Sequence, residues 1–226
     1  MGMTEKENEL FEEWAKERKD LVKDGIVDEK SYEDSDIKIL FVMKEVNDPG
    51  GGKWDLREFI RNGALRQTWD NITRWVRGIR DLDRDLDWEE ELSTVTPEQR
   101  KEVLKSISVM NLKKSPGGHI TDDHLLVEVA TKDKAYLRKQ FALYDPDIII
   151  CCGSSASYIF NNLIDFGKKP LWEITSRGIS FHEYAPDKQL ISFAHPEARV
   201  QDCLLYYGLI DAVKELRGRK YKSGRR

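Results

Sequence analysis

Three side chains that can support acid–base or hydrogen-bond chemistry each follow a predicted strand. Glu45 supplies a carboxylate that can orient water or accept a proton, and Asn111 supplies an amide that can pair with a planar heterocycle. His195 supplies an imidazole that can donate a hydrogen bond to a developing anion. Each also has a structural interpretation, as an ion-paired acid, an Asx turn and a packed histidine. Considered singly, none of the three decides a function.

The elements that would position these side chains alternate between strands and helices. Apolar runs predict strands at 37–43, 107–110, 148–152, 179–183 and 190–194. Helical periodicity and capping signals predict helices at 5–24, 65–80, 97–105 and 132–143, one opening at 153–156, and one at 202–216. The alternation predicts an α/β fold, a three-layer α/β/α sandwich with a mostly parallel central sheet. Since parallel strands end at one edge of a sheet, the loops at 44–52, 111–118, 153–156 and 195–199 should converge there.

Length and charge suggest one domain and a basic tail. The chain has 226 residues and a net charge of −4, and we expect a single domain over 1–216 with an N-terminal helical extension. The segment 217–226 holds six of the 37 Lys and Arg residues and no acid, so the remainder carries 31 basic against 41 acidic residues. An acidic body with a basic arm is compatible with phosphate binding through a local patch, or with a solvated tail.

Composition also limits the compartment. No stretch approaches the roughly 20 apolar residues that a membrane span needs, and the first residues lack the apolar core of a secretory signal. Three cysteines, with Cys151 and Cys152 adjacent in an apolar run, are typical of reduced buried thiols. We therefore expect a soluble cytoplasmic protein without a membrane partner. The sequence does not indicate an oligomeric state.

Taken in order, the strand-end motifs resemble those of the uracil-DNA glycosylase superfamily. The matching segments are SVMNLKKSPGG (108–118), DPDIIICCGSSA (145–156) and ISFAHPEAR (191–199), and the resemblance covers about 37–216. It implies a uracil-DNA glycosylase-like fold and a monofunctional DNA glycosylase. Such enzymes flip a nucleotide out of the stack and hydrolyse its N-glycosidic bond, leaving an abasic site. The substrate would be a uracil-type base or, as for some bacterial antiphage members, a hypermodified phage base.

The resemblance also implies roles for individual residues. His195 would stabilise the departing base anion, and Asn111 would read the base. Glu45 would position water or stabilise the sugar cation, and Asn47 and Asp48 in the same loop are further catalytic candidates.

Other residues would bind the base or the strand. Trp54 and Phe59 are candidates for stacking on the flipped base. The predicted contacts to single- or double-stranded DNA come from polar, basic and glycine residues in the strand-end loops: Lys113, Lys114, Ser115, Gly153, Ser154 and Arg199. The backbone of 49–52 would approach phosphate or base closely.

Two departures from the family pattern affect the expected substrate and cofactor. The run around Glu45 lacks the usual Gly and Pro, and Glu197 replaces a small residue after His-Pro. Uracil is therefore not assumed to be the substrate. Three cysteines cannot supply the four ligands of an iron–sulfur cluster, so we expect no cofactor and no metal.

Two alternatives remain open. A metal-dependent hydrolase is suggested by 119–124, which packs two His and two Asp into six residues, although Asp122 and Asp123 also suit a helix N-terminus. A non-catalytic nucleic-acid-binding protein could keep the fold and lose the chemistry. Binding without abasic product would indicate the second alternative, and activity that survives EDTA would exclude the first.

Overall fold

The computed structural model describes residues 1–48, 51–118, 120–167 and 169–223, with side chains described to Gly218. Its strands are β1 (Gly25–Ile26), β2 (Ile39–Met43), β3 (Ile107–Asn111), β4 (Ile148–Cys152), β5 (Glu173–Ile174), β6 (Ser180–Ala185) and β7 (Lys188–Phe193). Its α-helices are α1 (Met3–Trp14), α2 (Glu29–Glu33), α3 (Leu56–Arg61), α4 (Arg66–Arg80), α5 (Pro97–Leu104), α6 (Asp123–Lys132), α7 (Lys134–Ala142), α8 (Ser154–Leu163) and α9 (Asp202–Ser223). A π-helical turn, η1, spans Trp88–Leu92.

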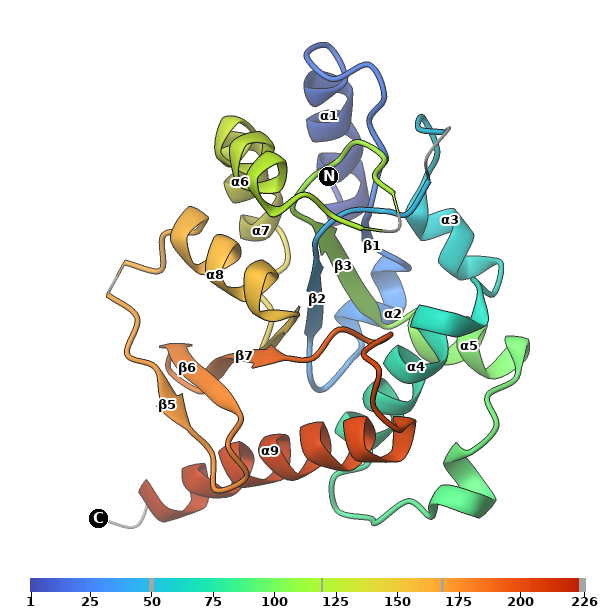
Figure 1. Ribbon diagram of the computed structural model, residues 1–226, viewed down its shortest axis with the longest axis vertical. Coiled ribbons are helices and arrows are strands. Elements are labelled where there is room, and N and C mark those ends of the chain that lie inside the picture. Colours follow the sequence, from blue (N-terminus) through green and yellow to red (C-terminus); the bar gives the residue numbers. More distant parts are fainter. Residues whose placement is uncertain (49–50, 119, 168, 224–226) are drawn as a thin grey trace.

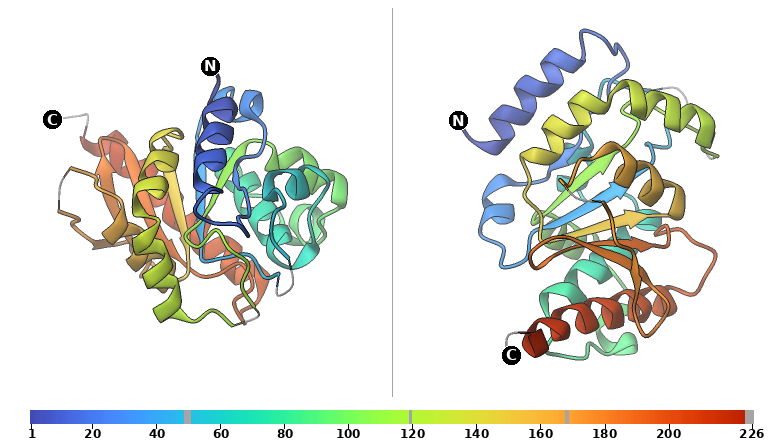
Figure 2. Two further views of the ribbon diagram at one scale, coloured as in Figure 1. Left: turned by 90° about the horizontal axis from the view of Figure 1, so that it is seen from above. Right: turned by 90° about the vertical axis from the view of Figure 1, so that its left-hand side faces the viewer.

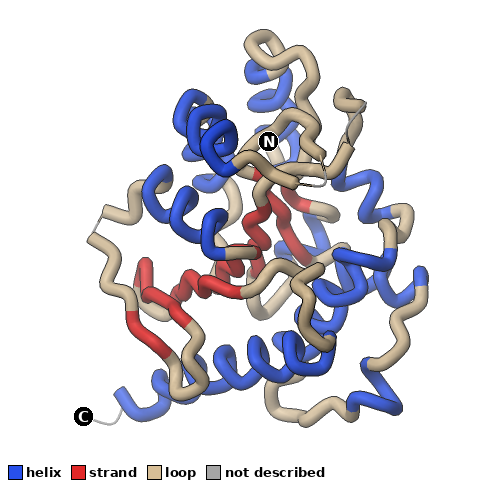
Figure 3. The backbone as a smooth tube through the Cα atoms, in the orientation of Figure 1, coloured by secondary structure: helices blue, strands red, loops and turns tan. Residues whose placement is uncertain are grey.

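Within the described residues, seven strands form one sheet in the order β1-β3-β2-β4-β7-β6-β5. The four central strands, β3, β2, β4 and β7, run parallel, while β1, β6 and β5 pair antiparallel at the two sides. Figure 3 shows the strands at the centre with helices around them. The prediction of a mixed α/β fold with a mostly parallel sheet is confirmed.

Helices cover both faces of this sheet, which explains why the strands are apolar throughout. Alternate β2 side chains enter opposite cores, with Phe41 packed among residues of α3, α4, α5 and α9, and Val42 among residues of α1, α6, α7 and α8. Strands buried on both faces read as continuous apolar runs rather than alternating ones. Figure 2 shows α1 and α9 on opposite sides of the sheet.

Among the described residues, no helix is long and apolar enough to cross a membrane.

Two helices differ from their predicted lengths. Helix α1 ends at Trp14, so the prediction of a helix over 5–24 is wrong in its second half. The reason is that Leu21 and Val22 bond to distant loops: Val22 N–H donates to the Lys114 carbonyl at 2.7 Å, and the Leu21 carbonyl accepts from Lys53 at 3.1 Å. Helix α9 continues through 217–223, where the sequence suggested a tail.

A buried acid, Glu7, ties α1 to the sheet. One of its carboxylate oxygens accepts from the Tyr144 hydroxyl and from Ile26 N–H, and the other accepts from Arg57 at 3.0 Å. Burial raises the pKa of Glu7 to about 7, against the opposing effects of Tyr144 and Arg57. A raised carboxyl pKa adds stability that is complete below about pH 4.5, the ordinary pKa of Glu, and is lost as pH rises through about 7.

The Glu7→Gln variant isolates this titration. Because Gln does not titrate, the unfolding free energy of the wild type minus that of the variant should fall by about 3 kcal/mol between pH 4.5 and pH 8. Urea unfolding at both pH values measures the difference. A difference that is the same at the two pH values would show that Glu7 keeps an ordinary pKa.

Candidate active site

The loops that follow the four parallel strands meet at one edge of the sheet, as the sequence predicts (Figure 1). The loops after β2 and β3 stay hydrogen-bonded beyond the strands, with Lys113 N–H donating to the Lys44 carbonyl at 2.9 Å and Gly117 N–H to the Val46 carbonyl at 2.8 Å. Gly153 N–H, after β4, donates to the Phe193 carbonyl at the end of β7 at 2.8 Å. In the sheet, β3 lies on one side of β2, whereas β4, the next strand along the chain, lies on the other side of β2. The carboxyl ends of β2 and β4 therefore flank the point where the strand order reverses, and ligands commonly bind at such a point in open α/β sheets.

Glu45 lies in the loop after β2 and pairs with a lysine from the loop after β3. Its carboxylate forms an ion pair with the Lys113 ammonium, and the two side chains are only 6% and 9% exposed. Lys113 also donates to the Pro116 carbonyl at 3.0 Å. A Cβ added at Gly117 would lie 2.1–2.4 Å from the Glu45 carboxylate. Lys113 and the absence of a side chain at residue 117 therefore fix the position of the carboxylate.

Asn111 ends β3 and is oriented by Asp24, a residue that the sequence analysis did not select. The Asp24 carboxylate accepts from the Asn111 backbone N–H at 2.7 Å and from its side-chain amide at 3.2 Å. The same carboxylate accepts from Lys114 at 2.6 and 2.7 Å and from Gln140 at 2.7 Å. Asn111 is 3% exposed, so Asp24 holds its amide in one orientation.

The three residues predicted to contact DNA just after Asn111 are buried in this structure. Lys113, Lys114 and Ser115 are 7%, 1% and 7% exposed, and the two ammonium groups are paired with Glu45 and Asp24. Burial lowers the pKa of Lys114, although Asp24 opposes this effect. In this structure both ammonium groups pair with carboxylates, so neither is free to bind a phosphate without a rearrangement.

His195 follows β7 in a half-buried position. Its Nδ1 accepts the Glu197 N–H at 3.1 Å, which leaves Nε2 as the protonated nitrogen of the neutral ring. Burial is the main cause that lowers the His195 pKa, with Lys44 acting in the same direction and Glu197 opposing. A neutral ring with Nε2–H can donate one hydrogen bond without carrying charge.

Helix α4 holds the loop that carries His195. The Asn71 amide donates to the Pro196 carbonyl at 2.8 Å and to Asp202, at the start of α9, at 2.9 Å. Arg74 donates to Asn71 and Asp202 at 2.7 and 2.9 Å. The buried polar side chains of α4 therefore position His195 from the neighbouring layer, a role that helical periodicity did not predict.

The rest of the loop after β2 is organised around Asp48. Its Oδ2 accepts from Gly52 N–H at 3.0 Å and from the Trp54 indole N–H at 2.7 Å. Trp54 contacts Phe59 edge to face at 5.8 Å between ring centroids, and both rings are half-buried. Asp48 therefore closes the loop, while Asn47 is exposed beside it. The roles of Trp54 and Phe59 in stacking on a base stay predictions. The backbone of 49–52 is predicted to approach phosphate or base, and residues 49–50 lie outside the described residues.

The loop after β4 begins with a glycine that the backbone requires. Gly153 has φ +106°, a conformation that L side chains rarely adopt. Ser154 then opens α8 and is exposed, as is Arg199 in the loop after His195. The predicted DNA contacts Ser154 and Arg199 therefore remain accessible.

An ionic bridge connects this loop to the loop after β2. The Asp123 carboxylate accepts from the Lys44 ammonium and from the Ser155 hydroxyl, each at 2.7 Å. Asp122 caps α6, accepting from the backbone of His124 and Leu125 at 2.9 and 3.2 Å. This confirms the interpretation of Asp122 as a helix N-terminal acid. Among the described residues, no group of three or more His, Cys, Asp and Glu could hold a metal ion, and His119 lies outside them.

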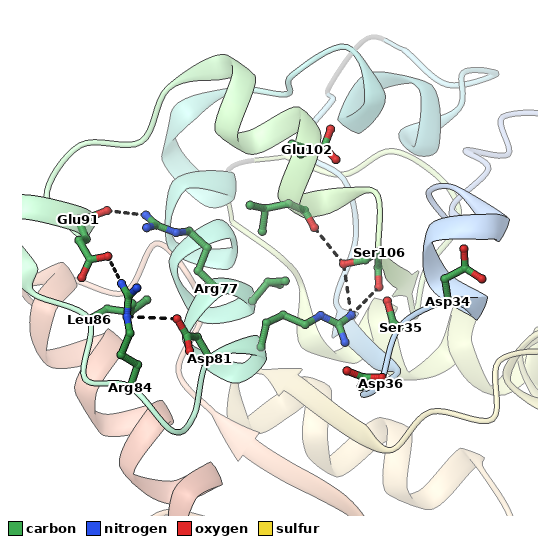
Figure 4. Close-up of a pocket in the computed structure, with 13 residues that line it drawn as sticks. Asp34, Ser35, Asp36, Arg77, Asp81, Arg84, Leu86, Glu91, Glu102 and Ser106 are labelled. Carbon is green, nitrogen blue, oxygen red and sulfur yellow. Dashed lines mark hydrogen bonds and ion pairs between the residues drawn. The ribbon is translucent and has the colours of Figure 1, made fainter.

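One cavity of the protein lies away from this edge. It measures about 570 Å³ and is lined by residues 34–36, which precede β2, and by Ser106, which precedes β3. Figure 4 shows Arg77 and Arg84 turned toward Glu91, and both arginines donate to that residue. Because this cavity is at the opposite ends of the strands, it does not belong to the candidate site.

No protein-family model matches the sequence, and no curated protein matches it either. The structure shows a mixed α/β protein whose parallel-strand loops bring a carboxylate, an amide and an imidazole to one edge of the sheet.

Proposed function

We propose that this chain is a monofunctional DNA glycosylase of the uracil-DNA glycosylase type. The observation that carries the proposal is the placement of Glu45 and His195 in loops at one edge of the sheet. One is a fixed carboxylate, and the other is an imidazole whose lowered pKa favours its neutral, Nε2-protonated form. Hydrolysis of an N-glycosidic bond develops positive charge on the sugar and negative charge on the base. A carboxylate can stabilise the positive charge on the sugar, and a neutral hydrogen-bond donor can stabilise the negative charge on the base.

In this proposal each group acts on one part of a flipped nucleotide. Glu45 stabilises the sugar cation and orients the attacking water. The C1′–N bond breaks with its electron pair leaving on the base, and the water oxygen bonds to C1′ while its proton passes to the Glu45 carboxylate. His195 Nε2–H donates to the carbonyl oxygen of the departing base. Asn111, oriented by Asp24, reads the base edge. Since Lys113 and Lys114 are buried, we assign the DNA contacts to exposed groups such as Ser154 and Arg199.

An abasic-site assay tests the proposal. Duplexes and single strands carrying uracil, hypoxanthine, xanthine or alkylated bases, and genomic DNA of phages with modified bases, are incubated with the protein in EDTA. Alkali-labile breaks on one substrate class support a metal-independent glycosylase. Binding without breaks on any substrate would favour the second candidate, a non-catalytic binder. The pairing of Glu45 with Lys113 is the observation that suits such a binder.

Gly117 gives a test of the carboxylate's position. Gly117→Ala should lower cleavage by roughly tenfold or more, because the new Cβ would lie 2.1–2.4 Å from the Glu45 carboxylate and displace it. Gly118→Ala is the matched control, since a Cβ there meets nothing within 4 Å. Single-turnover rates of the two variants give the comparison. Equal cleavage rates in the two variants would show that cleavage does not depend on the position of the Glu45 carboxylate.

A further inference from the structure

A second cavity, of about 450 Å³, opens beside the candidate site and has a different lining. Its lining residues come from α8, from the strands β6 and β7, and from the segment 169–172 that precedes β5. Figure 1 shows where α8, β6 and β7 lie in the fold. Ser154 at the start of α8 and Ser192 near the end of β7 both line it. These residues place the cavity next to the loops that carry the predicted DNA contacts. Its volume is in the range of small-molecule sites, roughly 300–1,000 Å³.

Two aromatic side chains in the lining expose much of their surface. Tyr158 of α8 is 71% exposed, and Trp172 is 39% exposed. The Trp172 ring packs edge-on against the buried His182 ring at 5.5 Å between centroids, so it is anchored on one side. Anchored aromatic rings that stay accessible are the platforms on which nucleobases stack.

The polar lining offers an acceptor that needs a donor. Asn161 Oδ1 is buried and has no hydrogen-bond partner among the described residues. A buried acceptor without a partner costs free energy. Because the Asn161 side chain lines the cavity, a rotation of its amide would turn this acceptor toward the cavity, where a ligand N–H would satisfy it. The hydroxyls of Ser157 and Ser180 lie in the same lining and can donate or accept. A nucleobase carries both an N–H donor and carbonyl or ring-nitrogen acceptors.

The charge of the lining points to an anion. Lys169 contributes an ammonium, and the described lining residues include no Asp or Glu. The cavity of about 570 Å³ differs, because five acids and three arginines line it together. A cation beside stacking rings and an amide suits a phosphate attached to a base-bearing sugar.

We propose that this cavity is a nucleotide-binding pocket, in which the base stacks on Trp172 and donates to Asn161 while the phosphate pairs with Lys169. The proposal concerns binding alone and stands whether or not the chain cleaves DNA. The nucleotide can be free, or it can be one unit of a DNA strand that continues to the neighbouring site.

Calorimetric titration of the full chain with thymidine monophosphate, thymidine and a thymidine tetranucleotide tests the proposal. Trp172→Ala should weaken binding of the monophosphate roughly five- to 150-fold, the effect of removing a stacking platform. Lys169→Ala should weaken binding of the monophosphate and leave binding of thymidine unchanged. Tyr207→Ala is the matched control: Tyr207 is 41% exposed, similar to Trp172, but lies on α9 outside the lining. It should bind like the wild type.

The two sources of the nucleotide give different results. Tighter binding of the tetranucleotide than of the monophosphate, lost in Trp172→Ala, supports a strand in the pocket. Equal binding of the two supports a free nucleotide. Absence of binding to all three probes would overturn the proposal. Binding that neither Trp172→Ala nor Lys169→Ala weakens would also overturn it, because the nucleotide would then lie elsewhere.

Discussion

Glu45→Gln is expected to lower N-glycosidic cleavage by roughly tenfold or more while DNA affinity stays within about twofold of the wild type. The amide keeps the shape of the side chain and can still accept from Lys113, but it has no charge to stabilise the sugar cation and cannot accept a proton from water. Single-turnover cleavage and fluorescence anisotropy of labelled DNA measure the two quantities separately.

A second variant separates catalysis from support of the loop. Lys113→Gln also removes the ion pair but keeps the Glu45 carboxylate, to which the new side-chain amide can still donate a hydrogen bond. If Glu45 acts on the substrate, Lys113→Gln should retain clearly more activity than Glu45→Gln. Equal losses in the two variants would mean that the pair only holds the two loops together. Glu12→Gln, at an exposed position of α1, is the control for loss of one negative charge.

Lys114→Met should destabilise the protein by about 3–5 kcal/mol, because it leaves the buried Asp24 carboxylate without its cation. Both side chains are 0% exposed, and the ammonium contacts both carboxylate oxygens. Lys105→Met is the control: its ion pair with Glu102 is on the surface, so its loss should cost less than about 1 kcal/mol. Urea unfolding provides both free energies.

The same variant tests how Lys114 relates to DNA. A buried lysine makes no phosphate contact, so the dependence of DNA affinity on salt should not change in Lys114→Met. A stability loss below about 1 kcal/mol, together with a reduced salt dependence, would contradict the buried pair and restore the phosphate contact.

The sequence predicts the sheet and its loops well because local patterns determine them. Runs such as 148–152 are apolar along their whole length, since the sheet is covered on both faces. Strand ends marked by Gly153 or His195 then place the loops at one edge. The short elements are missed because β1 and β5, at two residues each, carry no periodic signal.

Contacts between distant segments could not be predicted in this way. The sequence predicts Lys114 as an accessible basic residue of a loop, because its partner, Asp24, lies 90 positions earlier in the chain. Lys44 donates to Asp123, which lies 79 positions later in the chain, and Asn71 donates to the carbonyl of Pro196, which lies 125 positions later. Which lysine is buried and which is exposed depends on such partners, so the site residues that support others emerge only from the structure.

The most direct test of the central claim is to measure the free base released from DNA by mass spectrometry. Wild-type protein and Glu45→Gln are each incubated with DNA of several base compositions, including DNA from phages with modified bases, in the presence of EDTA. We predict release of one class of free base by the wild type, with an equal number of abasic sites, and little release by the variant. DNA binding without any released base, or equal release by both proteins, would contradict a glycosylase that depends on Glu45.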